Sequence, residues 1–212
     1  MNHVNMNYKI LILFTIAMLS FSAKAQYFNA GAKLGIVASQ VDGDTYSGFD
    51  KLGFNIGAFV NYKLSYRTSL QLELEYIQKG SKHNPNYDKN DFEQYKMSLS
   101  YIQVPVILQY KLSQNMAVEA GPSFGVLISN YEERDNFEIS SNPFRNFALN
   151  ISAGFVYTLN ENWKVNFRND YSLLGIRQKA APGDRYIWFH YGQFNNALVL
   201  SIQYVISHAK DK

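Results

Sequence analysis

Hydrophobic and polar residues alternate one by one along most of the chain after residue 26, a pattern typical of β-strands with two different faces. In the clearest segment, Leu70, Leu72 and Leu74 alternate with Gln71 and Glu73. A helix would instead repeat its hydrophobic positions about every 3.6 residues. We predict eight strands, with boundaries near 27–40, 52–64, 67–79, 95–112, 115–129, 146–159, 162–176 and 193–206.

The lengths of these segments and of their connections favour a membrane barrel. The segments span about 12 to 18 residues, whereas strands of soluble proteins usually have about 5–6 and membrane strands need roughly 9–11. Tight links at Ser65-Tyr66, Ser113-Gln114 and Asn160-Glu161 alternate with long polar links. Short turns on one side and long loops on the other are typical of outer-membrane barrels. The sequence therefore predicts an all-β, eight-stranded antiparallel up-and-down transmembrane β-barrel with both termini in the periplasm.

The N-terminal segment has the layout of an export signal. Lys9 precedes an apolar run over 10–21, and Ala23 and Ala25 place small residues at a cleavage site before Gln26. The run is too short for a membrane-spanning helix, which needs roughly 20 residues, although an uncleaved anchor is the alternative. We expect a signal peptide over 1–25, a barrel over 26–206 and a short tail over 207–212.

The composition supports a membrane barrel and excludes several kinds of chemical site. Charged residues make up 17% of the chain, against about 25% in typical soluble domains. The formal charge of +3 includes Lys9 and Lys24 of the expected signal, so the mature chain is near +1, and its basic residues form no stripe for nucleic acid. The absence of cysteine excludes disulfides, thiolate metal sites and a lipoprotein anchor. We predict no nucleic-acid partner; outer-membrane lipid is the expected surrounding.

Aromatic residues recur at matching positions of the predicted strands. The rings expected at the periplasmic end of the lipid-facing surface belong to Tyr62, Tyr110, Tyr157, Trp163 and Tyr204. An amphipathic ring prefers the headgroup boundary, so this register predicts an aromatic girdle, although general aromatic enrichment in strands is the alternative. A second, outer girdle could include Phe54, Tyr76, Phe147, Tyr171 and Phe194.

The opposite face of the strands is rich in polar and charged residues. The predicted lumen network contains Lys33, Glu73, Glu75, Gln103, Glu119, Lys164, Arg168 and Asp170. An eight-stranded barrel is just wide enough for its side chains to fill, and unpaired buried charges are costly. We therefore expect paired ions that close the lumen. The alternatives are a gated solute path or catalysis by Glu73 and Glu75.

Pro105 and Pro122 fall inside two adjacent predicted strands. Proline cannot donate a hydrogen bond to the ladder and is normally found at edges or bulges. The sequence predicts a β-bulge at one or both.

No motif for a cofactor, a metal or a catalytic centre stands out. His83, His190 and His208 lie apart, without metal-binding spacing, and there is no HExxH or GxSxG motif. We predict no cofactor, no metal and no enzymatic activity.

The sequence resembles the PorT-like outer-membrane β-barrel family. The matching segments are GAKLGIVAS, LGFNIGAF, LQLELEYIQKGSK, YIQVPVILQYKL and GPSFGVLIS in the first five predicted strands. The resemblance implies a small barrel, and the founding member of that family is linked to a protein secretion apparatus. The chain departs from many barrels by continuing past Tyr204 into a polar tail.

Four functions fit these patterns. The first is a non-enzymatic barrel that serves the envelope or a secretion or surface complex through its long extracellular loops. The others are a small-solute pore or transport component, a lipid-modifying outer-membrane enzyme and a soluble lipocalin-like binder.

Overall fold

The computed structural model describes residues 28–139, 143–177, 185–187 and 190–207. The predicted signal peptide over 1–25 and tail residues 208–212 lie outside these ranges.

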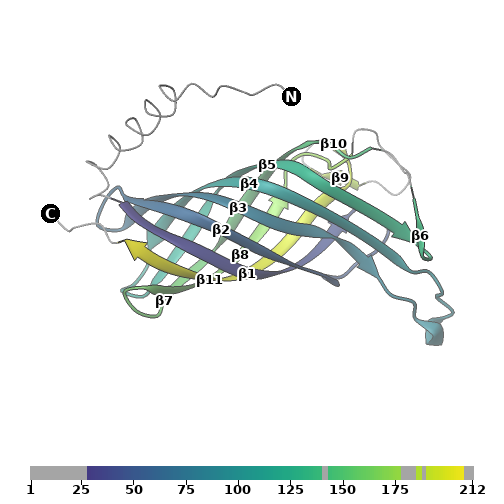
Figure 1. The fold of residues 1–212 in the computed structure, drawn as a ribbon, viewed down its shortest axis with the longest axis horizontal. Coiled ribbons are helices and arrows are strands. Elements are labelled where there is room, and N and C mark those ends of the chain that lie inside the picture. Colours follow the sequence, from purple (N-terminus) through teal and green to yellow (C-terminus); the bar gives the residue numbers. More distant parts are fainter. Residues whose placement is uncertain (1–27, 140–142, 178–184, 188–189, 208–212) are drawn as a thin grey trace, which may run out of the picture.

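Eight long antiparallel strands close into a barrel (Figure 1). They are β1 (Phe28–Asp42), β2 (Lys51–Lys63), β3 (Thr68–His83), β4 (Tyr95–Lys111), β5 (Met116–Arg134), β7 (Phe147–Thr158), β8 (Trp163–Ser172) and β11 (Phe194–Ser207). Each strand pairs with the next one along the chain, and β11 pairs with β1. Closure gives every strand a partner on both sides, so the barrel wall has no free edge. The predicted eight-stranded barrel is therefore confirmed.

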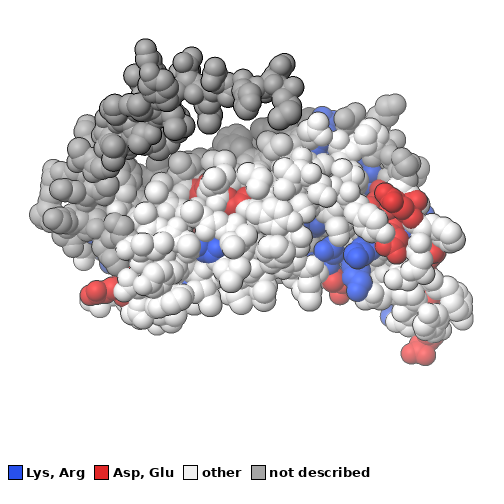
Figure 2. Space-filling model, viewed as in Figure 1, with Lys and Arg blue, Asp and Glu red and all other residues white. Residues whose placement is uncertain are grey.

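The two faces of the strands follow the alternation seen in the sequence. On β3, Gln71, Glu73 and Glu75 are buried in the lumen, whereas Leu72 and Leu74 are exposed on the outer wall. Figure 2 shows the consequence for one face of the molecule: the wall is largely uncharged, and charged residues gather toward the end where β6 lies. An apolar outer wall of this kind suits lipid.

The ends of the barrel differ. The turns at 64–67, 112–115 and 159–162 are short and lie at the end where β1 begins and β11 ends. At the other end, β3, β4 and β5 extend beyond their neighbours. Three short elements belong to this end: the 3₁₀ turn η2 (Tyr87–Lys89), β6 (Phe137–Glu138) and the hairpin of β9 (Arg185–Ile187) with β10 (His190–Gly192).

The two prolines do not create bulges, so that prediction was wrong. Pairing is interrupted beside Pro105 in the β3–β4 ladder and beside Pro122 in the β4–β5 ladder, but the register is the same before and after each gap. Each proline removes a ladder donor without adding a residue to its strand. The register shifts seen in the described strands lie instead at Ser100/Tyr101 and Ala30/Gly31.

Two glycines allow close approach between strands. A Cβ at Gly121 would lie 2.0 Å from the carbonyl oxygen of Val106, at the interrupted part of the β4–β5 ladder. Gly80 has a φ of +144° and a similar clash with the Met97 carbonyl. Side chains at either position would therefore displace the neighbouring strand.

Within the described residues, no helix is long and apolar enough to cross a bilayer.

Candidate functional site

The middle of the lumen contains five charged side chains in direct contact, which we call the charge layer: Lys33, Glu73, Glu75, Glu119 and Arg168. Lys33 Nζ lies 2.5 Å from Glu73 Oε2 and 2.6 Å from Glu75 Oε2. Arg168 connects two carboxylates, with Nη2 2.8 Å from Glu73 Oε1 and Nε 2.8 Å from Glu119 Oε1. All five side chains are buried, so solvent screens these ion pairs little.

Amide side chains add hydrogen bonds to the three carboxylates of the charge layer. Asn55 donates to Glu75 at 2.9 Å and Gln71 donates to Glu73 at 2.8 Å. Glu119 accepts from Gln109 at 2.9 Å and from Asn166 at 2.7 Å. Because the carboxylates are both paired and hydrogen-bonded, they can stay charged inside the barrel.

Three other predicted lumen residues lie outside this layer. Asp170 pairs with Lys79 and accepts a hydrogen bond of 2.9 Å from Ser152. Gln103 is buried, but its side-chain amide has no hydrogen-bond partner among the described residues. Lys164 is only half-buried and lines the mouth of the barrel at the end of the short turns. Lys79 was missed by the sequence analysis because the predicted third strand ended at that position.

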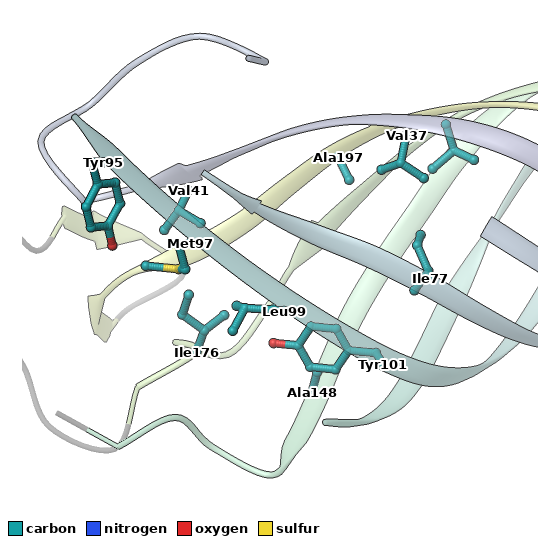
Figure 3. Close-up of a cluster of buried hydrophobic side chains, with 11 residues drawn as sticks. Val37, Val41, Ile77, Tyr95, Met97, Leu99, Tyr101, Ala148, Ile176 and Ala197 are labelled. Carbon is teal, nitrogen blue, oxygen red and sulfur yellow. The ribbon is translucent and has the colours of Figure 1, made fainter. Parts of the chain in front are cut away.

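The half of the lumen toward the long loops is filled by hydrophobic side chains (Figure 3). We call this group the apolar cluster; its members are Val37, Val41, Ile77, Tyr95, Met97, Leu99, Tyr101, Ala148, Ile176, Ala197 and Val199. Four of them come from the inward face of β4, which contributes Met97 and Leu99 with no exposed surface. Sequence analysis did not identify this cluster, since it considered only the polar and charged residues of the inward face.

A further buried ion pair lies beside the apolar cluster. Arg177 Nη2 lies 2.6 Å from Glu132 Oε1, which also accepts a 2.6 Å hydrogen bond from the Tyr95 hydroxyl. The Nε of Arg177 donates to Gln193 at 2.7 Å, and its guanidinium lies 4.2 Å from the centre of the Phe144 ring. This pair links the end of β5 to the loop after β8.

At the opposite end, beside the short turns, lies a cavity of about 840 Å³, which we call the short-turn vestibule. Its walls come from the short-turn ends of all the long strands except β11 and from the turn residues around Arg67 and Asn115. Four cationic side chains line it: Lys63, Arg67, Lys111 and Lys164.

The described residues contain no group of three His, Asp or Glu side chains that could hold a metal ion. His83 contacts Asp91 at 2.6 Å and stacks on Tyr46. His190 and His208 have no described side chains.

A comparison with family models matches residues 20–177 to the outer membrane protein beta-barrel domain. The chain belongs to this outer-membrane β-barrel family. Family membership indicates the outer membrane as its location. Comparison with curated proteins finds no match.

Solved structures show the same fold in other outer-membrane barrels. Neisserial surface protein A aligns with a TM-score of 0.53 and 11% identity, covering 84% of this chain and 97% of that chain. The attachment invasion locus protein Ail of Yersinia pestis aligns with a TM-score of 0.44 and 11% identity, covering 83% and 97%. At such identity the likeness to the Neisserial protein concerns the fold alone.

On this outer-membrane barrel, the five rings predicted for the periplasmic girdle all lie on the outer wall, about half exposed. They are Tyr62, Tyr110, Tyr157, Trp163 and Tyr204. Trp163 and Tyr204 are in contact, with ring centres 4.7 Å apart, and Tyr62 contacts Phe28 at 5.3 Å. Of the residues considered for an outer girdle, Phe194 has no exposed surface, so its inclusion was wrong.

Proposed function

We propose that this chain is a non-enzymatic outer-membrane barrel with a lumen closed to solutes, which contacts envelope, secretion or surface-complex proteins through its long extracellular loops. The observation that carries the proposal is the charge layer. A route through the barrel would have to separate Arg168 from both Glu73 and Glu119, leaving charges unpaired away from water.

The apolar cluster supports closure at a second level. Met97, Leu99 and Val37 have no exposed surface, so side chains occupy the axis between the charge layer and the loops. A solute would have to displace packed hydrophobic groups as well as ion pairs. The charge layer and the apolar cluster therefore each disfavour a conducting pore, at separate depths in the lumen.

The extracellular end offers the more accessible surface for partners. Tyr87 and Phe92 are exposed on the β3–β4 extension, where their ring centres lie 5.8 Å apart. Phe137 is exposed on β6, next to the end of β5. Exposed aromatic groups of this kind favour contact sites.

The finer features of the proposal follow from the sequence. We infer cleavage before Gln26, both barrel termini in the periplasm and a PorT-like role in a secretion or surface complex. Positions of β1 and β11 support the second inference, because Phe28 and Ser207 lie at the same end as the short turns. The five outer rings would then mark the periplasmic headgroup boundary.

Conductance across a planar bilayer tests closure of the lumen. The wild-type protein should show no unit conductance. A Glu73→Ala/Arg168→Ala variant removes one charge of each sign but leaves the apolar cluster in place, so it should also show no unit conductance if it folds, as judged by its heat-dependent shift on electrophoresis. Reproducible channels from the wild-type protein would reject the closed lumen and support a solute pore.

Site-specific photocrosslinking in cells tests the role of the loops. A crosslinker at Tyr87 or Phe137 should give a defined adduct with an envelope protein, identified by mass spectrometry. The matched control is Tyr66, which is at least as exposed but lies on a turn at the end proposed to face the periplasm. Absence of adducts from both outer positions would contradict a loop-mediated partnership.

A further inference from the structure

Three lysines from neighbouring strands lie close together at the long-loop end of the barrel wall, and we call them the lysine cluster. They are Lys51 of β2, Lys82 of β3 and Lys96 of β4. Lys82 and Lys96 are directly opposite each other in the β3–β4 ladder, a position where like charges destabilise a sheet. Both repel Lys51, so it lies within electrostatic reach of the pair. An anion bound here would relieve this repulsion.

Carboxylates of the described residues do not neutralise the lysine cluster by direct ion pairs. Glu133 opposes Lys96 in the β4–β5 ladder, but its carboxylate accepts a hydrogen bond of 2.8 Å from the Tyr131 hydroxyl. Asp50 precedes Lys51 in the sequence, yet the charges that act on Lys51 are those of Lys82 and Lys96. The three cations therefore reinforce one another.

The lysine side chains keep donors for an external partner. Ser81 and Met97 are buried beside Lys82 and Lys96, so alternation places these two lysines on the outer face. Lys96 Nζ lies 5.9 Å from the centre of the Tyr131 ring, and Lys51 donates to the Leu52 carbonyl at 2.9 Å. An ammonium group has three N–H donors, so these contacts leave donors on each lysine.

The lysine cluster lies where the apolar outer wall ends. On β2 the outward residues are apolar from Tyr62 to Leu52, a stretch of about 33 Å along the strand, or roughly 25 Å of height at a tilt of about 40°. The apolar band of outer-membrane barrels is about 25 Å tall. Lys51 directly precedes Leu52, so its backbone lies at the edge of this band.

The strand register places Lys82 at a similar level. Asn55 pairs with Ile77; Lys51 lies four residues before Asn55, and Lys82 lies five residues after Ile77. Figure 2 shows basic side chains gathered on one face of the molecule where the uncharged wall ends. This is the level at which the headgroups of the surrounding lipid begin.

We propose that the lysine cluster binds the phosphate of a lipid headgroup, while Leu52 and Phe54 contact the acyl chains of the same lipid. Leu52 and Phe54 are 73% and 42% exposed on the outer wall, directly below the cations. Charge-assisted hydrogen bonds to phosphate are strong, and each lysine near a membrane surface adds to the attraction. In the orientation proposed above, the lipid belongs to the outer leaflet. The site is separate from the exposed aromatic residues of the loops and does not depend on closure of the lumen.

Native mass spectrometry of the folded protein in neutral detergent tests the site, with lipid A and dephosphorylated lipid A of the same acyl chains as probes. Wild-type protein should bind lipid A saturably and about tenfold more tightly than the dephosphorylated form. Lys82→Gln/Lys96→Gln should abolish this preference. Because the substitutions remove a repulsive pair, the variant should fold, which its heat-dependent electrophoretic shift verifies.

The matched control is Lys63→Gln/Lys111→Gln, which removes the same charge from exposed positions at the short-turn end. It should keep the preference for the phosphorylated lipid within about twofold of wild type. Equal binding of the two lipids by the wild-type protein, or an equal loss of preference in both double variants, would overturn the proposal.

A second arm distinguishes a lipid from a soluble anion. Inorganic pyrophosphate at the same concentration as lipid A should not displace it from the wild-type protein, because pyrophosphate has no acyl chains to contact Leu52 and Phe54. Displacement by equimolar pyrophosphate would show that the lysines bind phosphate without the apolar wall, which would overturn a lipid ligand.

Discussion

The two halves of the lumen fill the same cylinder with opposite chemistry. Toward the short turns, Lys33, Glu73 and Arg168 form a network in which each charge depends on its partners. Toward the loops, side chains such as Met97 and Leu99 contact one another without directional bonds. The comparison suggests that the charge layer determines how the strands are placed across the barrel, whereas the apolar cluster contributes stability in proportion to the surface it buries.

Removing one partner from the charge layer should have the largest effect. Arg168→Met leaves Glu73 and Glu119 buried without their shared cation, so we expect a loss of about 3–5 kcal/mol in the free energy of unfolding. Urea unfolding in lipid vesicles, followed by tryptophan fluorescence, measures it. Arg168→Met/Glu73→Gln/Glu119→Gln removes the stranded charges and should recover most of the loss. A loss below about 1 kcal/mol for the single variant would contradict an interdependent charge layer.

Truncating a side chain of the apolar cluster should lower the free energy of unfolding by less than the Arg168→Met substitution does. This loss should not depend on a compensating substitution elsewhere. Leu99→Ala removes a side chain with no exposed surface, and we expect a loss of about 2–4 kcal/mol. The same unfolding assay applies. The control, Tyr87→Ala, alters an exposed ring and should change stability by less than about 0.5 kcal/mol. Equal effects at both positions would mean that the cluster is not a packed core.

Asp44 gives a further test of the comparison between the charge layer and the apolar cluster, because its carboxyl group lies beside the apolar half of the lumen. Burial raises the pKa of Asp44 from 3.8 to about 6, although hydrogen bonds from Ser81 and the Tyr46 N–H oppose the shift. The folded chain thus holds this proton more tightly than the unfolded chain. The stabilisation is complete below pH 3.8 and is lost as the pH rises through about 6.

We therefore expect Asp44→Asn to raise stability by about 2 kcal/mol at pH 7. The gain should disappear below about pH 4, where wild-type Asp44 is protonated as well. Unfolding of the two proteins in parallel from pH 4 to 8 measures the difference. A difference that is independent of pH would show that the Asp44 carboxyl does not titrate in this window.

The sequence predicted the strands of the barrel wall better than it predicted the side-chain contacts inside the lumen. Alternation alone located all eight strands, because a membrane barrel must present apolar side chains outward at every second position. The five members of the charge layer are all among the charged residues that alternation placed on the inward face, where a buried charge needs a partner. The individual pairings depend on strands far apart in the sequence, such as those of Glu73 and Arg168, and alternation gives no information about them.

The sequence did contain a pattern that indicates the apolar cluster, a change in the alternation along β4. On β4, the hydrophobic positions are Ile102, Val104 and Leu108 on the outer face, but they become Met97 and Leu99 on the inner face. This change of parity occurs beside the register shift at Ser100/Tyr101. On the N-terminal side of this register shift, Ser98 and Ser100 occupy the outer face of β4. The change of parity predicts where the wall stops facing lipid, and the same test could be applied to other barrels.

The strands end at different heights around the rim that faces away from the short turns. The β5–β7 ladder ends at Val126, yet β5 continues through residues 127–134, roughly 26 Å of extended chain. Together with β3 and β4 it forms a tall wall on one side, while the strands β7 and β8 stop low on the other. A molecule diffusing in the plane of the membrane would therefore meet a different profile from each side. Such a skewed rim favours a single orientation of a neighbour over a symmetric ring of contacts.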